Sequence, residues 1–294
     1  MCHFSTMMRF STVFLFVTAA SVWAGFTVPA GPWQQLPNPL AVSGERIVDA
    51  NRNIAGNQTA YWNNNTADGT TCKNIGCIVT GRVASTASDP LTNAIWRDAA
   101  YIANTDGTAV TNVYFQGSVS GPAVLNGEIT SLKARSWVGW YDATLPTSEL
   151  TSANFGTKWG VIFKGSDSVG KQANFSPTNQ FGFWYLAGFS NTDKTSTELS
   201  AALKTDTARF TQSSKNTAGA GQTTQYFTYF AENLAAVNAS TLNLLISAED
   251  TIRGDMDYND TIFRVTFVPE PGLYGALALC LGALMAAIRR RAAR

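Results

Sequence analysis

Residues 261–267, with the sequence Thr-Ile-Phe-Arg-Val-Thr-Phe, decide how this chain folds. Successive side chains of an extended strand point to opposite faces, so Phe263, Val265 and Phe267 share one face. A period of two with apolar residues on one side predicts a β-strand that covers a core.

Similar short runs of aromatic and β-branched residues recur along the chain, separated by Gly, Asn and Ser. They lie at residues 111–116, 136–141, 158–164, 180–186, 224–230 and 241–246. Many short strands joined by turn-forming residues are typical of an all-β fold. We therefore predict an antiparallel β-sandwich of the jelly-roll or immunoglobulin-like type. A helix is expected only at residues 195–204.

The polarity of the chain suggests a division within this body. Residues 25–105 are richer in polar residues and Asn, with fewer strand signals, and are expected to form a looser, loop-rich part. Residues 110–268 are expected to form the main sandwich.

The first 24 residues have the pattern of a secretory signal peptide. Residues 1–9 are polar with one positive charge, and residues 10–20 are almost entirely apolar. In Val22-Trp23-Ala24, small residues occupy the two positions that a signal peptidase reads. This gradation predicts export with cleavage after Ala24, rather than an ordinary buried helix.

The other end of the chain predicts a membrane helix. Residues 272–288 contain no charge, and their 17 residues are at the lower limit for crossing a bilayer. Arg289, Arg290, Arg291 and Arg294 follow, and such clusters stay on the cytoplasmic side. The residues between the two ends, 25–268, are therefore expected outside the cytoplasm.

The charge of the exported part argues against nucleic acid as a partner. The chain has 21 Lys and Arg residues, of which Arg9 lies in the signal and four lie in residues 272–294, but none of its 20 Asp and Glu residues lies in either of these segments. Residues 25–271 therefore carry a net charge of −4, which does not suit binding to phosphates.

Two cysteines remain in the exported part, Cys72 and Cys77. In an oxidising compartment a disulfide that closes this short loop is the favoured interpretation. Half of a zinc site is the alternative, but the only histidine, His3, lies in the signal.

The absence of histidine from residues 25–294 also limits the chemistry. Catalytic triads and Cys-His pairs need an imidazole. Carboxylate chemistry, as in glycoside hydrolysis, remains open because two acids suffice.

Acidic residues are concentrated in one segment, where five of the 20 lie within residues 249–260. Hard cations such as calcium take six to eight oxygen ligands, and clustered carboxylates in a glycine-containing loop supply them. The expected ligands are Glu249, Asp250, Asp255, Asp257, Asn259 and Asp260. A polar turn without metal and a catalytic acid pair remain as alternatives.

Aromatic runs such as Trp137, Trp140 and Tyr141, or residues 183–185, admit two interpretations. They could stack on sugar rings, but such residues more often fill a sandwich core.

The C-terminal tail resembles the PEP-CTERM sorting signal of Gram-negative bacteria. Pro269, Glu270 and Pro271 match its motif and are followed, in order, by the apolar stretch and the arginine cluster. The resemblance implies processing by an exosortase and association with exopolysaccharide and biofilm matrix.

The segment before the tail resembles a β-rich domain of unknown function found at the ends of bacterial surface and adhesin-like proteins. The matching residues are Glu249-Asp250, Gly254, Asp255, Asp257, Tyr258, Asn259 and Asp260, a final strand at 262–267 and Phe181-Gly182-Phe183 upstream.

Together these features predict a non-enzymatic surface or extracellular-matrix protein, stabilised by calcium, anchored in the membrane until it is processed and then associated with polysaccharide. A carbohydrate-binding module and a carboxylate-only glycan hydrolase remain as alternatives.

Overall fold

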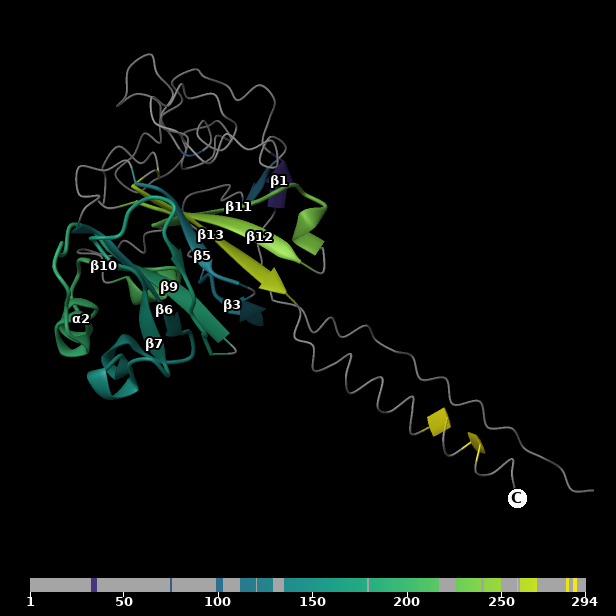
Figure 1. Cartoon of the computed structure of the whole chain (residues 1–294), viewed down its shortest axis with the longest axis horizontal. Helices are drawn as coiled ribbons and strands as arrows, with labels where there is room; N and C mark the ends of the chain where they lie inside the picture. Colours follow the sequence, from purple (N-terminus) through teal and green to yellow (C-terminus); the bar gives the residue numbers. More distant parts are fainter. Residues whose placement is uncertain are drawn as a thin grey trace, which may run out of the picture.

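The computed structural model describes two antiparallel sheets and the short α-helix α2 beside them (Figure 1). The residues that it describes are 33–35, 75, 99–102, 112–119, 121–128, 135–178, 180–216, 226–238, 241–249, 258, 260–268, 284–285 and 288–289. Within these residues the predicted all-β, antiparallel class is confirmed.

The larger sheet has the strand order β1-β2-β11-β12-β13-β5-β8, and β4 also pairs with β13. Its strands are β1 (Trp33–Gln35), β2 (Ala100–Ile102), β4 (Ser118–Val119), β5 (Ala123–Gly127), β8 (Gln172–Ala173), β11 (Phe227–Ala231), β12 (Leu242–Ala248) and β13 (Thr261–Val268). Because β1 and β2 join this sheet, the described part of residues 25–105 contributes to the same layer as the main strands.

The smaller sheet has the order β10-β9-β6-β7, and β3 also pairs with β9. Its strands are β3 (Phe115–Gln116), β6 (Trp137–Asp142), β7 (Trp159–Phe163), β9 (Gln180–Leu186) and β10 (Ala208–Phe210). The 3-10 turns are η3 (Thr147–Glu149), η4 (Ser152–Asn154), η5 (Ser213–Lys215) and η6 (Ala236–Asn238).

Aromatic side chains join the two sheets. Phe115 of β3 lies 5.2 Å from Phe183 in its own sheet, and 5.1 Å from Phe267 and 5.9 Å from Tyr229 in the other, measured between ring centroids. Phe263 of β13 likewise lies 5.3 Å from Phe183. The sheets therefore pack face to face, as in a β-sandwich.

A second cluster covers the opposite face of the smaller sheet. There Trp159 and Trp184 pack with Leu199 and Leu203, which come from α2 (Ser196–Ala202) and its C-cap. Thr195 caps the helix, since its hydroxyl accepts from the Glu198 amide and the Glu198 carboxylate accepts from the Thr195 amide. The helix predicted at residues 195–204 is confirmed, and both faces of the smaller sheet are covered.

Glycines let aromatic rings lie across neighbouring strands of the smaller sheet. Gly139 of β6 pairs with Trp184 of β9, and Gly182 of β9 pairs with Tyr141 of β6. A Cβ at Gly139 would collide with the Trp184 ring and with the Gly160 carbonyl, and one at Gly182 would lie 2.6 Å from the Tyr141 hydroxyl. The missing side chains therefore provide the space that these buried rings occupy.

The predicted signal peptide and most of the predicted membrane helix, residues 272–288, lie outside the described residues. Among the residues that the structure describes, no helix is long and apolar enough to cross a membrane.

Gly139→Ala should destabilise the protein by about 3 kcal/mol, because neither the Gly160 carbonyl nor the buried Trp184 ring has room to move. Urea unfolding followed by tryptophan fluorescence would measure the change. Gly127→Ala is the control: its Cβ would meet only Ile262, whose Cδ1 lies 3.3 Å away, and should cost less than about 1 kcal/mol. Equal costs at the two positions would contradict the role of the glycine–aromatic pairs.

Candidate functional site

The acid-rich segment connects β12 and β13, which form an antiparallel hairpin. Their register runs from Leu242 opposite Phe267 to Ala248 opposite Thr261. Residues 249–260 therefore connect the last paired residues of the two strands, Ala248 and Thr261, and this acidic connection is called the acidic loop below.

Glu249, the first residue of this segment, is fully buried, and its carboxylate reaches Tyr258 near the other end of the segment. Its Oε2 accepts a hydrogen bond of 3.2 Å from the backbone amide of Tyr258. Its own amide donates to the Tyr226 carbonyl at 3.0 Å, which ties the loop to the segment that leads into β11.

Tyr258 anchors the other side of the loop. Its side chain is fully buried and its φ is 54°, a left-handed backbone conformation that is unusual for a bulky residue. The Tyr258 amide donates to the Glu249 carboxylate, and the Ser247 hydroxyl donates to the Tyr258 carbonyl. These two hydrogen bonds offset the cost of the unusual conformation and fix how the chain leaves the loop.

The structure places two of the expected calcium ligands. Glu249 and Asp260 stand at opposite ends of the loop, and both are almost wholly withdrawn from solvent. Asp250, Asp255, Asp257 and Asn259 lie outside the described residues. Within the described part of the chain, no three His, Cys, Asp or Glu residues form a group that could hold a metal.

The donor chemistry at the loop mouth suits a hard cation, which prefers carboxylate oxygens. Two buried carboxylates on facing strand ends are costly unless a positive charge or hydrogen bonds compensate them. The Tyr258 amide donates such a hydrogen bond to Glu249. In a calcium site Glu249 and Asp260 would hold the loop ends, and the acids between them would complete the oxygen set.

The aromatic residues considered as sugar platforms are core residues. Trp137, Trp140 and Tyr141 are buried, and so are the aromatic residues at 183–185. Core packing is therefore the correct interpretation of both runs. Cys72, Cys77 and the motif at residues 269–271 lie outside the described residues, so the disulfide and the sorting motif stay predictions.

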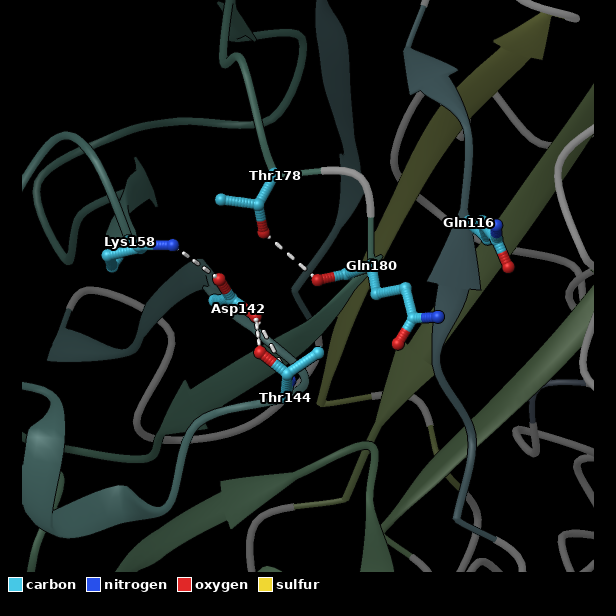
Figure 2. A pocket seen from close by; sticks show the side chains of 6 residues that line it. All are labelled: Gln116, Asp142, Thr144, Lys158, Thr178 and Gln180. Carbon is cyan, nitrogen blue, oxygen red and sulfur yellow. Dashed lines mark hydrogen bonds and ion pairs between the residues drawn. The ribbon is translucent and has the colours of Figure 1, made fainter.

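The structure also shows a polar hollow that the sequence analysis missed (Figure 2). It has a volume of about 430 Å³ and lies where several strand ends of the smaller sheet meet. The residues that line it are Gln116, Asp142, Thr144, Lys158, Thr178 and Gln180. The sequence signal that could have indicated it is Asp142-Ala143-Thr144 at the end of a strand, since an Asp side chain favours capping of a turn two residues later.

Asp142 is the organising group of this hollow. One carboxylate oxygen accepts from the Thr144 amide at 3.0 Å and the Thr144 hydroxyl at 2.6 Å, and the other accepts from Lys158 Nζ at 3.1 Å. Burial by itself would raise the pKa of Asp142, but the hydrogen bonds from Thr144 and the nearby Lys158 ammonium outweigh it. The pKa of Asp142 is therefore below its ordinary value, and the carboxylate is ionised at neutral pH.

A comparison of the chain with protein-family models, with curated proteins and with solved structures finds no match. Function must therefore be argued from the residues of this chain.

Asp142→Asn should destabilise the protein at pH 7 by about 1–3 kcal/mol, because it weakens a buried, charge-assisted set of hydrogen bonds. The folded pKa is lowered from an ordinary 3.8, so the carboxylate stabilises fully above about pH 4 and progressively less as the pH falls through the folded pKa. Urea unfolding from pH 7 to pH 2 should show the two proteins converging at the acidic end.

The control is Asp206→Asn, which changes an exposed carboxylate and should stay within about 0.5 kcal/mol of the unmodified protein. A constant gap between Asp142→Asn and the unmodified protein across the whole pH range would contradict the assigned role of the Asp142 charge.

Proposed function

We propose that this chain is a non-enzymatic, exported surface or extracellular-matrix protein that is sorted by an exosortase and stabilised by calcium. The observation that carries the proposal is where the folded body ends. Strand β13 stops at Val268, and the sorting motif begins with the next residue, Pro269.

The position of β13 makes this boundary informative. It pairs with β12 on one side and with β5 and β4 on the other, so it is an interior strand of the larger sheet. Phe263, Val265 and Phe267 from the same strand are buried in the core. Removal of the tail after Val268 would leave every described strand in place, as a disposable sorting tail requires.

The described residues of the tail support a membrane-held stage before processing. Leu284, Met285 and Ile288 have helical backbone and are more than half exposed to solvent. Three exposed apolar side chains within five residues are the kind of surface that contact with a bilayer would cover. Arg289 follows directly, and the predicted orientation places this basic end in the cytoplasm.

Calcium has a structural part in this proposal. Closing the hairpin withdraws Glu249 and Asp260 from water at the mouth of a loop that carries three further acids. A bound cation would cancel the repulsion between them and hold β12 to β13. The loop would then be a stabilising clamp in the calcium-containing space outside the cell.

A catalytic function has less support. The exported body has no histidine, and among the residues that line the hollow Asp142 is the one carboxylate, already paired with Lys158. Glycoside hydrolysis needs two acids that face the bond to be cut.

We also propose that the sandwich belongs to the jelly-roll or immunoglobulin-like type.

Calcium should raise the melting temperature of the purified protein. A ligand at 100 times its dissociation constant adds about 2.7 kcal/mol, which corresponds to about 5–10 °C for a body of this size. Asp255→Ala combined with Asp257→Ala should abolish the rise, measured by thermal unfolding with millimolar calcium or with EGTA.

A matched control removes two exposed acids elsewhere, Glu149→Ala with Asp206→Ala, and should keep the full response. An unmodified protein whose melting temperature is unchanged by calcium would remove the metal from the proposal.

Mass spectrometry of the protein recovered from producing cells should show that residues 272–294 are absent, because the exosortase cuts near residues 269–271. Replacing Pro269, Glu270 and Pro271 by Ala should leave the tail attached, whereas Leu273→Ala, outside the motif, should still be processed. A mature unmodified protein that keeps its tail would contradict the sorting part of the proposal.

A further inference from the structure

The polar hollow at Asp142 gathers its residues from the same end of four strands. Asp142 ends β6, Gln116 ends β3, Gln180 begins β9, and Lys158 immediately precedes β7. The register brings them together, since Gln116 pairs with Gln180 and Asp142 pairs with Phe181, next to Gln180. The hollow is therefore fixed by the sheet and does not depend on a long loop.

The two charged side chains of the hollow, Asp142 and Lys158, neutralise each other. The Asp142 side chain, only 6% exposed, is neutralised by Lys158 at 3.1 Å, so the side chains that line the hollow carry no net charge. Thr144 holds the other carboxylate oxygen. In the view of Figure 2 the Gln180 side chain lies between this Asp142–Thr144 pair and Gln116.

These groups select against most classes of ligand. The ammonium of Lys158 would repel a metal ion, and its pairing with Asp142 weakens its attraction for an anion. The lining offers no large apolar side chain, so an apolar ligand would bury polar groups without compensation.

Amides and hydroxyls that both donate and accept hydrogen bonds suit a neutral ligand that does the same. The two Gln amides can donate and accept, whereas the hydroxyls of Thr144 and Thr178 donate to Asp142 and to the Gln180 carbonyl and so remain acceptors. This mixture of donors and acceptors matches the vicinal hydroxyl groups of a sugar. The volume of about 430 Å³ lies within the range of small-molecule sites. Gln116, Thr144 and Lys158 are solvent exposed, so the hollow is open at the surface and a unit within a long chain can reach it.

An exposed aromatic ring lies two residues before Gln116, just ahead of β3. Exposure alternates from Asn112 to Gln116, with Val113 and Phe115 buried and Tyr114 and Gln116 exposed on the opposite side. Tyr114 therefore shares its exposed side with Gln116, and an exposed Tyr is the kind of side chain on which a sugar ring stacks.

We propose that the hollow formed by Asp142, Lys158, Gln116 and Gln180 is a binding site for neutral sugar units of an extracellular polysaccharide. This inference rests on the proposed surface role and names the hollow as the part of the protein that contacts polysaccharide. Asp142 is a positioning residue, and the two Gln amides contact the sugar hydroxyls.

The test measures binding of the full chain, purified in detergent, to neutral polysaccharides (dextran and galactomannan) and to anionic alginate by affinity gel electrophoresis. At least one neutral polymer should retard the protein. Gln116→Ala and Gln180→Ala should each weaken that binding about fivefold or more, the effect of losing one or two hydrogen bonds. Gln172→Ala, which removes an exposed Gln from β8 in the other sheet, is the matched control and should bind like the unmodified protein.

Three outcomes would overturn the site: no binding to either neutral polymer, binding to alginate alone, or equal binding by all variants. The measurement is repeated in EGTA, where binding should persist. Loss of binding in EGTA would place the sugar at the acidic loop and would also overturn the proposal. Export and tail removal are read separately by mass spectrometry, so a processed protein that binds no neutral polymer contradicts this site and leaves the proposed function standing.

Discussion

The pairing of β12 with β13 is the interaction on which the rest of the molecule depends. These strands stay in register from Leu242–Phe267 to Ala248–Thr261, in the interior of the larger sheet. Their buried residues Leu244, Ile246, Phe263 and Val265 are part of the core between the sheets. The same hairpin is joined by the acidic segment at one end and leads into the proposed sorting motif at the other, so core, acidic segment and tail all connect to one element.

Much of this arrangement could be predicted from the sequence, because most strands coincide with runs of aromatic and β-branched residues. The run at residues 180–186 coincides with β9, and the one at 261–267 lies within β13. The acidic loop was recognised because its composition is unusual. The burial of Glu249 and its hydrogen bond to Tyr258 were not foreseen, since they depend on how the two strands align.

Two features could not be read from the sequence for physical reasons. Every residue of β6 is buried, because one face of the smaller sheet meets the larger sheet and the other meets the cluster around α2. Alternation therefore could not tell which aromatic residues were exposed. The polar hollow is assembled from four strand ends that are far apart in the chain, and common residues such as Gln and Thr show no pattern until the sheet aligns them.

The central claim is that a cation at the acidic loop holds the β12–β13 hairpin closed. Hydrogen–deuterium exchange of the purified protein, with calcium or with EGTA, tests it most directly. The account predicts slower exchange with calcium in peptides that cover residues 242–249 and 260–268, and unchanged exchange in those that cover β6 and β9. Equal exchange of the hairpin peptides in the two conditions, or the same slowing in β6 and β9, would contradict it.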